Sequence, residues 1–541
     1  MKKLLLLFAI ILVQQGYGQT EDAWVFFADK ENVAASLADP ILIMTQEAID
    51  RKALQGTLID ERDVPVNEDY ITQIKDATGI NVFAKSKWMN CVYVQGTQAN
   101  IEALLDLSFV IDVEYANKSL NLFPGVPVED KFALENESAG QRITYNYGAA
   151  ANQIEMLSGD FLHELDYAGA DMIIAVLDAG FPTVNTNPGF ASMVSEGRLL
   201  GTYDFQARTT NVDGTSSHGT NTSSDIGGFL VNQFVGTAPQ ASYYFFVTEY
   251  TPTETPVEEA HWVEALERSD SLGVDVINTS LSYKGYDDTS YTHSYADLDG
   301  QTTFAARGGN IAFDKGMILV CSAGNSGNSG SPFPGTPADS PGVLTIGAVD
   351  SNGNYVSFSS RGPTVDGRLK PDVMAQGSGS AVISTGGYVD FSSGTSFSSP
   401  IMAGVVACLW QSRPEVPNAQ IMQVVRESAH LFNNPTNQMG YGIPNFEDAY
   451  IALQELGIEE EFLLSNFALY PNPVSSRINI SFPQQIQNAQ FTVHSILGKE
   501  VLTTEISATS NIVDIETLSA GMYIATISAN NNRISFKIIK E

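Results

Sequence analysis

Hydrophobic positions in the middle of the chain form short continuous runs, and these runs alternate with segments of helical spacing. The runs at 172–177, 243–247 and 317–320 are fully apolar, while 257–272 has the spacing of a helix. Strands buried on both faces of a sheet show such continuous runs, and helices are the usual crossovers between parallel strands. We therefore predict an α/β domain over residues 146–455, with a parallel β-sheet covered by helices on both faces.

The two ends of the chain have other patterns. Residues 19–118 combine predicted strands at 87–94 and 109–115 with a predicted helix at 99–107, which indicates a small α+β domain. Residues 468–541 alternate apolar and polar positions with a period of two between turn residues, which is typical of a small β-sandwich.

Two segments are predicted to connect these domains. Residues 119–145 are polar and contain Pro and Gly, which suits an exposed linker, and residues 456–467 bridge to the last domain. With 541 residues, the chain is long enough for several separate cores.

Residues 1–18 have the features of a secretory signal peptide. Two lysines precede an apolar run at 4–13, which is too short to span a bilayer, and Gly16 and Gly18 suit cleavage after residue 18. No later run stays apolar for eighteen residues. We expect an exported protein without a transmembrane segment.

Composition narrows the classes of partner. The 28 Lys and Arg residues face 62 Asp and Glu residues, so the formal net charge is −34. Such a surface repels nucleic acid, and we expect no nucleic-acid partner. The three cysteines do not suggest a disulfide framework.

Four residues follow predicted strands or open predicted helices, and their chemistry suits acyl transfer. A serine hydroxyl needs a base to accept its proton, and that base needs an anion that fixes its tautomer. Ser396, His218 and Asp178 are the candidates for these three roles. Asn325 is the candidate donor for the oxyanion, together with the N–H groups of the helix that Ser396 opens.

The sequence motifs around these residues resemble those of the subtilase (subtilisin-like protease) family. Their order of Asp, His and Ser is that of subtilisin and differs from the orders in chymotrypsin and the α/β-hydrolases. The words that carry the resemblance are Val176-Leu177-Asp178-Ala179-Gly180, Ser217-His218-Gly219-Thr220, Val276-Ile277-Asn278-Thr279-Ser280-Leu281, Ser322-Ala323-Gly324-Asn325, Phe358-Ser359-Ser360-Arg361-Gly362-Pro363, Lys370-Pro371-Asp372-Val373 and Gly394-Thr395-Ser396-Phe397-Ser398-Ser399-Pro400.

This resemblance implies a secreted serine endopeptidase that acts on proteins or peptides through an acyl-enzyme, with Asn325 in the oxyanion hole. It also implies a substrate-binding pocket for the residue before the scissile bond, bordered by Ser280, Leu281, Ser282, Ser322, Ala323 and Gly324. Ser282 and Phe397 depart from the usual family residues, Gly and Met, and these departures concern substrate preference.

The outer domains also resemble known modules. The first resembles a subtilase propeptide, which implies an intramolecular inhibitor and folding aid. The last resembles the sorting domain of type IX secretion, through Tyr470-Pro471-Asn472-Pro473 and the terminal Lys537-Ile538-Ile539-Lys540. It implies export through the periplasm and across an outer membrane by the type IX machinery, to the cell surface or the medium.

Alternatives remain open at this point. An inactive subtilase scaffold could serve as a cell-surface binding protein, and an esterase of the α/β-hydrolase class is disfavoured by the residue order. The predicted chemistry needs no cofactor. Acidic loops could hold structural Ca²⁺, but no spaced ligand set is visible. His261 and His430 lie on predicted helices and His494 on a predicted strand, so none of them is a candidate site residue.

Overall fold

The structure of the protein is a computed structural model. It describes residues 20–121, 145–465, 467–482, 488–495, 500–529 and 532–541, so the predicted signal peptide and most of the 119–145 linker lie outside the described residues. The chain forms two compact units, which divide at Ala449 and Tyr450. Within the described ranges, no helix combines the length and the apolar character needed to cross a membrane.

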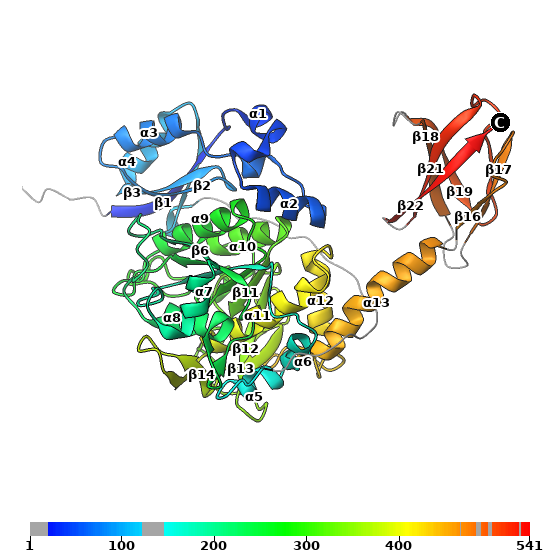
Figure 1. Ribbon diagram of the computed structural model, residues 1–541. Coiled ribbons are helices and arrows are strands. Elements are labelled where there is room, and N and C mark those ends of the chain that lie inside the picture. Colours follow the sequence, from blue (N-terminus) through cyan, green and yellow to red (C-terminus); the bar gives the residue numbers. More distant parts are fainter. Residues whose placement is uncertain (1–19, 122–144, 466, 483–487, 496–499, 530–531) are drawn as a thin grey trace, which may run out of the picture. The chain divides into compact units, whose positions relative to one another are not determined.

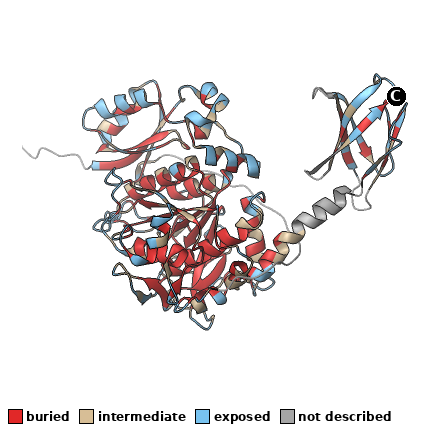
Figure 2. Cartoon of the chain, in the orientation of Figure 1, coloured by how far each residue is buried: buried red, intermediate tan, exposed pale blue. Residues whose placement is uncertain are grey.

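The central domain is built on a seven-stranded sheet with the order β13-β12-β11-β10-β5-β9-β6. All neighbouring strands in it are parallel. The predicted apolar runs form its buried strands (Figure 2). The strands are β5 Ile173–Asp178, β6 Leu199–Asp204, β9 Ser242–Val247, β10 Val276–Thr279, β11 Ile318–Ser322, β12 Val343–Val349 and β13 Val373–Gln376.

Helices cover both faces of this sheet, as the sequence predicts (Figure 1). Helices α9 (Val257–Ser271) and α10 (Phe304–Asp314) pack over one face, where Leu177 and Trp262 share a core. Helices α8 (His218–Gly227) and α11 (Thr395–Gln411) pack together, and α11 lies along β10 to β13. The remaining elements are α5 Ala151–Glu155, α6 Gly159–Glu164, α7 Ala191–Ser195, α12 Asn418–Glu427, α13 Phe446–Ser465 and the hairpins β7 Phe229–Leu230 with β8 Phe234–Val235 and β14 Ser380–Ile383 with β15 Val389–Ser392.

The N-terminal domain has a four-stranded antiparallel sheet with the order β2-β3-β1-β4. Its elements are β1 Thr20–Phe27, α1 Val33–Ala38, α2 Gln46–Gln55, α3 Glu68–Asp76, β2 Asn81–Ser86, β3 Cys91–Thr97, α4 Gln98–Glu102 and β4 Val110–Tyr115. The strand predicted at 87–94 is wrong in its first half. Residues 87–90 form a turn, in which Asn90 has a φ of +51°.

The N-terminal sheet packs on α9 and α10 of the central domain. Trp24 of β1 stacks on Phe304 of α10, with ring centroids 4.8 Å apart. The carboxylate of Glu267 on α9 accepts hydrogen bonds from Ser86 Oγ at 2.5 Å, Lys87 N at 2.8 Å and Trp88 N at 3.0 Å. The turn that replaces the predicted strand therefore binds the central domain through its backbone.

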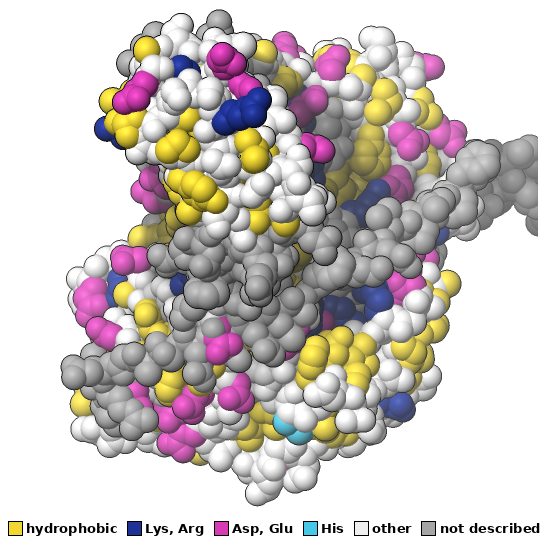
Figure 3. All heavy atoms as spheres, turned by 90° about the vertical axis from the view of Figure 1, so that its right-hand side faces the viewer, with side chains coloured by type: hydrophobic (Ala, Val, Ile, Leu, Met, Phe, Trp, Pro, Cys, Tyr) yellow, Lys and Arg dark blue, Asp and Glu magenta, His cyan; other side chains and the backbone are white. Residues whose placement is uncertain are grey.

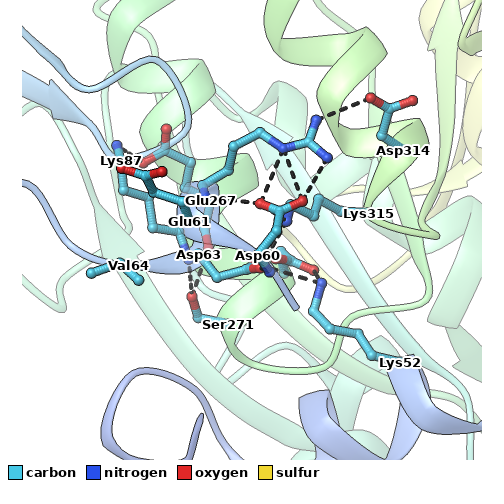
Figure 4. A network of polar contacts seen from close by, with 12 residues as sticks. Lys52, Asp60, Glu61, Asp63, Val64, Lys87, Glu267, Ser271, Asp314 and Lys315 are labelled. Atoms are coloured by element: carbon cyan, nitrogen blue, oxygen red, sulfur yellow. Dashed lines mark hydrogen bonds and ion pairs between the residues drawn. The ribbon is translucent and has the colours of Figure 1, made fainter. Parts of the chain in front are cut away.

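A network of buried ion pairs joins the same two domains beside these contacts (Figure 4). Lys52 of the N-terminal domain binds Asp270 of the central domain at 2.7 Å. In the opposite sense, Lys315 of the central domain binds Asp63 at 2.7 Å and Asp60 at 2.9 Å. The side chains of Asp63, Asp270 and Lys315 are fully buried.

The C-terminal domain holds two antiparallel sheets, β16-β17-β20 and β19-β18-β21-β22. Ile480 from the first sheet and Phe491 and Ile527 from the second share one core, which confirms the predicted small β-sandwich. The strands are β16 Ala468–Tyr470, β17 Arg477–Ser481, β18 Asn488–Ser495, β19 Glu500–Ser507, β20 Ile512–Asp514, β21 Gly521–Ala529 and β22 Asn532–Lys540.

Two of the three predicted histidine positions are confirmed. His261 and His494 lie on α9 and β18 as predicted, but His430 lies in the turn after α12, where its Nδ1 accepts the N–H of Ile443 at 2.9 Å. Acidic side chains are scattered over the face shown in Figure 3, in line with the net charge of −34.

Candidate functional site

The candidate residues come from element ends at one edge of the central sheet. Asp178 is the last residue of β5, and His218 is the first residue of α8. Ser396 is the second residue of α11, and Asn325 lies just beyond the end of β11 at Ser322. The carboxyl ends of parallel strands meet at one edge of a sheet, which is where open α/β sheets place their sites.

Asp178 and His218 are in direct contact. His218 Nδ1 lies 2.8 Å from Oδ1 and 2.9 Å from Oδ2 of Asp178, whose side chain is fully buried. The carboxylate also accepts the N–H of Ala179 at 2.7 Å and the hydroxyl of Thr222 at 3.0 Å. These bonds hold the carboxylate in place and keep the Nδ1 proton of the imidazole directed at it.

The electrostatics of this pair favour a basic imidazole. The charge of Asp178 raises the pKa of His218 above its ordinary value, and the hydrogen bond between them acts in the same direction, while burial opposes both. Because Nδ1 faces the carboxylate, Nε2 is the ring atom left to exchange a proton with another group.

Ser396 lies at the start of α11, where the residue is buried, with 8% of its surface exposed. Its Oγ donates to the carbonyl of Ser280 at 3.4 Å, and no hydrogen bond joins it to His218 in this conformer. The ring of the next residue, Phe397, lies 5.9 Å from the His218 ring. Rotation about χ1 re-aims a serine hydroxyl, and catalytic hydrogen bonds are often long before substrate binds.

Asn325 is oriented by the loop before α11. Its Oδ1 accepts from Thr395 N at 2.9 Å and from Thr395 Oγ1 at 3.0 Å, which leaves Nδ2 as its free donor. Gly394 has a φ of +152°, and a Cβ built on it would lie 3.5 Å from Asn325 Nδ2 and 3.7 Å from Ser396 N. The two donors therefore border the same space above Gly394.

The residues predicted to bind substrate fall into two groups. Ser280 Oγ donates to the Ser396 carbonyl at 2.9 Å, and the Ser282 hydroxyl lies against Gly324, 3.8 Å from the position of a Cβ there. Ser280 therefore lies beside Ser396 and Ser282 beside Gly324, while Leu281 packs against the core that contains Leu177 and Trp262. Ser322 and Ala323 are buried at the end of the sheet, at 2% and 0% exposure, so they offer almost no surface to a substrate.

The sequence interpretation missed two residues that shape this site. Thr222 lies one helical turn after His218, a spacing that could have identified it as a partner of Asp178. Thr395 joins Asn325 to the loop and also accepts the Gly324 N–H at 3.1 Å. No sequence signal marks this second role.

The predicted structural Ca²⁺ would be held by acidic and other metal-binding side chains. Within the described parts of the chain, no three or more His, Cys, Asp or Glu side chains gather as a metal site would require. The structural Ca²⁺ stays a prediction.

Three family models match successive parts of the chain. The model of the subtilase family matches residues 169–442, that of the Peptidase S8 propeptide domain of Bacteroidota matches 22–135, and that of the secretion system C-terminal sorting domain matches 468–541. The first of these matches covers half of the chain.

Several curated proteins are similar to this chain. Serine protease AprX of Bacillus subtilis is 25% identical over 391 residues, which is 67% of this chain and 79% of that protein. Subtilisin E of the same species is 29% identical over 344 residues, which is 62% of this chain and 78% of that protein. The thermophilic serine proteinase of Bacillus sp. (strain AK1) is 26% identical over 391 residues, 72% of this chain and 88% of that protein.

These matches confirm the resemblance seen in the sequence and the predicted destination. The C-terminal domain is a type IX sorting domain, which directs a protein to the cell surface or outside the cell, and the N-terminal domain is a propeptide. The chain belongs to the subtilase family of serine proteases.

Proposed function

We propose that this protein is a secreted serine endopeptidase that cleaves peptide bonds through Asp178, His218 and Ser396. The observation that carries the proposal is the contact of His218 Nδ1 with both oxygens of the buried Asp178, at the sheet edge where Ser396 opens α11. An imidazole held in this way by a carboxylate is suited to accept a serine proton through Nε2.

In the proposed reaction, Ser396 Oγ attacks the scissile carbonyl while its proton moves to His218 Nε2. The C–O bond forms and the carbonyl π electrons move onto oxygen, which gives a tetrahedral oxyanion. The N–H of Ser396 and Nδ2 of Asn325 are the proposed donors to it, because both border the space above Gly394.

Collapse of this intermediate breaks the C–N bond. The proton on His218 passes to the leaving amine, and Ser396 keeps the acyl group as an ester. Water then attacks the ester with His218 again as base, which releases the acid product and restores the hydroxyl. Asp178 stays ionised throughout and stabilises the imidazolium at each step.

The propeptide is the proposed intramolecular inhibitor and partner in folding. It covers α9 and α10 and pairs with Asp270 and Lys315 through buried charges. Protein or peptide substrates are the proposed partners of the mature enzyme.

The test is Ser396→Ala in the secreted protein. We expect casein hydrolysis to be lost while the circular dichroism spectrum and the melting temperature stay unchanged, because the change removes one oxygen atom at the nucleophile position. Hydrolysis at the wild-type rate by the folded variant would refute the role of Ser396.

A further inference from the structure

A carboxylate next to the candidate site has no role in the chemistry above. Glu249 follows the end of β9, whose last residue, Val247, pairs with Asp178 in the sheet. The N–H of the intervening Thr248 donates to the Asp178 carbonyl at 3.2 Å. Glu249 therefore directly follows Thr248, which binds the backbone of Asp178, the candidate catalytic acid.

Glu249 is held by one oxygen only. Its Oε1 accepts from Tyr283 Oη at 2.6 Å and from Thr248 Oγ1 at 2.9 Å, while Oε2 has no hydrogen bond or ion pair with any described residue. Tyr283 lies three residues after Ser280, the residue whose carbonyl accepts from Ser396. The bond from Tyr283 to Glu249 thus joins the two segments that flank the acid and the nucleophile.

The charge of Glu249 is not balanced by a cation of the protein. By contrast, two buried carboxylates have such partners: Asp372 binds Lys370 at 2.7 Å and Arg426 at 3.0 Å, and Asp270 binds Lys52 at 2.7 Å. No Lys, Arg or His of the described residues forms an ion pair with Glu249. A partly desolvated carboxylate is strongly stabilised when a cation reaches it.

The pKa values of Glu249 and its neighbour Glu258 agree with the absence of a cationic partner among the described residues. Burial raises the pKa of Glu249 to about 7, against the hydrogen bonds from Tyr283 and Thr248, and the charges of Glu254 and Asp178 add to the increase. Burial likewise raises the pKa of Glu258 to about 9. The oxygens of Glu258 accept the N–H groups of Tyr250 at 3.1 Å and Thr255 at 3.2 Å, so Glu258 supports the loop.

The backbone at Ser282, next to the Tyr283 that binds Glu249, has a free edge. Tyr283 pairs with Thr336 through N–H···O bonds of 2.8 and 3.1 Å, but the exposed Ser282 forms no backbone hydrogen bond with any described residue. An extended peptide can add to such a free edge through its own backbone groups. A peptide aligned here, with its carbonyl at Ser396, would pass the segment that carries Tyr283 and its partner Glu249.

We propose that Glu249 determines specificity by binding a lysine or arginine side chain of the substrate close to the scissile bond. The free Oε2 accepts from the ammonium or guanidinium group, while Oε1 keeps its bond to Tyr283. This inference rests on the proposed proteolytic function and names the class of substrate for that site: chains with a basic residue within a few positions of the cleaved bond.

A purely structural role for Glu249 would be to anchor Tyr283. Glu249→Gln separates the two roles, because the amide oxygen can still accept from the Tyr283 hydroxyl while the negative charge is lost. Glu254→Gln is the matched control, since it removes one charge from the same loop and Glu254 has no part in the proposed contact.

The experiment uses the processed, secreted enzyme and a positional-scanning library of fluorogenic peptides. Lysine and the uncharged norleucine are then compared at the best position as a matched pair. We expect wild type and Glu254→Gln to prefer lysine by roughly 10- to 100-fold in kcat/KM, the range of a hydrogen bond to a charged group. We expect Glu249→Gln to lose this preference. Its kcat/KM for the norleucine peptide should stay within about threefold of wild type, because norleucine has no charge for Glu249 to bind.

The outcomes separate the two proposals. Equal cleavage of both peptides by wild type, or a lysine preference that survives Glu249→Gln, would overturn the role of Glu249 and leave the protease intact. Loss of the preference in Glu254→Gln instead would also overturn it. Absence of any Ser396-dependent cleavage of the library would overturn the proposed function itself.

Discussion

Asp178 and Asp270 are both fully buried aspartates of the central domain, but their partners come from different places. Asp178 is held by His218, Thr222 and Ala179, which belong to the same domain. Asp270 is held by Arg51 and Lys52, which belong to the propeptide. Removal of the propeptide would therefore leave Asp178 fully bonded and deprive Asp270 of both cations.

The candidate site is thus built within one domain, whereas the interface is shared with the propeptide. The proposed catalytic pair is assembled by elements of one domain, so its geometry does not depend on the propeptide. The interface depends on charges that are neutralised only while both domains are present, and an unpaired buried charge is costly. Four expected outcomes, one of them with a matched control variant, test this difference.

The largest effect is expected for Asp178→Asn. The amide can keep a contact with His218 but favours the wrong imidazole tautomer, so we expect kcat to fall about 10⁴-fold with little change in KM. Steady-state kinetics on a peptide substrate measures it. A decrease of less than tenfold would contradict the role of Asp178.

Lys315→Met addresses the interface. It leaves Asp63 buried without its closest cation, so we expect the Ser396→Ala precursor to lose about 3–5 kcal/mol in the free energy of unfolding. The processed enzyme should change by less than about 1 kcal/mol, because the partners of Lys315 have left with the propeptide. Urea titrations of both forms give these values.

Arg62→Met is the matched control for this variant. Arg62 also pairs across the interface, with Asp314 at 3.1 Å, but its side chain is 37% exposed. Exposed ion pairs contribute about 0–1 kcal/mol, so the precursor should barely change. Equal losses of unfolding free energy in the two variants would show that burial does not determine how much these ion pairs contribute.

Asn325→Ala tests the oxyanion donor. We expect kcat to fall about 100- to 1,000-fold with a nearly unchanged KM, because the donor acts on charge that develops in the transition state. The same kinetic assay measures it. An effect confined to KM would place Asn325 in ground-state binding instead.

The last expected outcome concerns pH. Neutral His218 is the base, and Asp178 raises its pKa above the ordinary value of about 6.5, so the protonated, inactive form persists to higher pH. We expect kcat/KM to rise as pH increases through a midpoint above about 6.5 and to fall about tenfold per pH unit below it. An acid limb centred well below this value would contradict the influence of Asp178 on His218.

Much of the fold follows from local patterns. The apolar run at 172–177 predicted β5 almost to the residue, because a strand buried on both faces leaves little choice of side chain. The strand predicted at 87–94 begins only at Cys91, since the backbone N–H groups of Lys87 and Trp88 bind Glu267. That partner lies about 180 residues away, and local periodicity carries no information about it.

The candidate site likewise combines residues that the sequence identified with residues that only the structure reveals. Distinctive sequence motifs identified the four candidate residues, and the structure brings them to one edge of the sheet: Asp178, His218, Asn325 and Ser396. Glu249 stands in no such motif. Thr395 does, but its role, like that of Glu249, comes from contacts with Asn325 and Tyr283 that only the folded chain makes. The pairing of Lys52 with Asp270, which are 218 residues apart, was equally invisible.

Labelling with a fluorophosphonate probe tests most directly whether Ser396 and His218 act as one catalytic unit. The processed enzyme is treated with the probe, and the adduct is located by mass spectrometry of its peptides. We expect a single adduct on Ser396 in wild type and none in His218→Ala. An adduct on another serine, or undiminished labelling of Ser396 without the imidazole, would contradict the account.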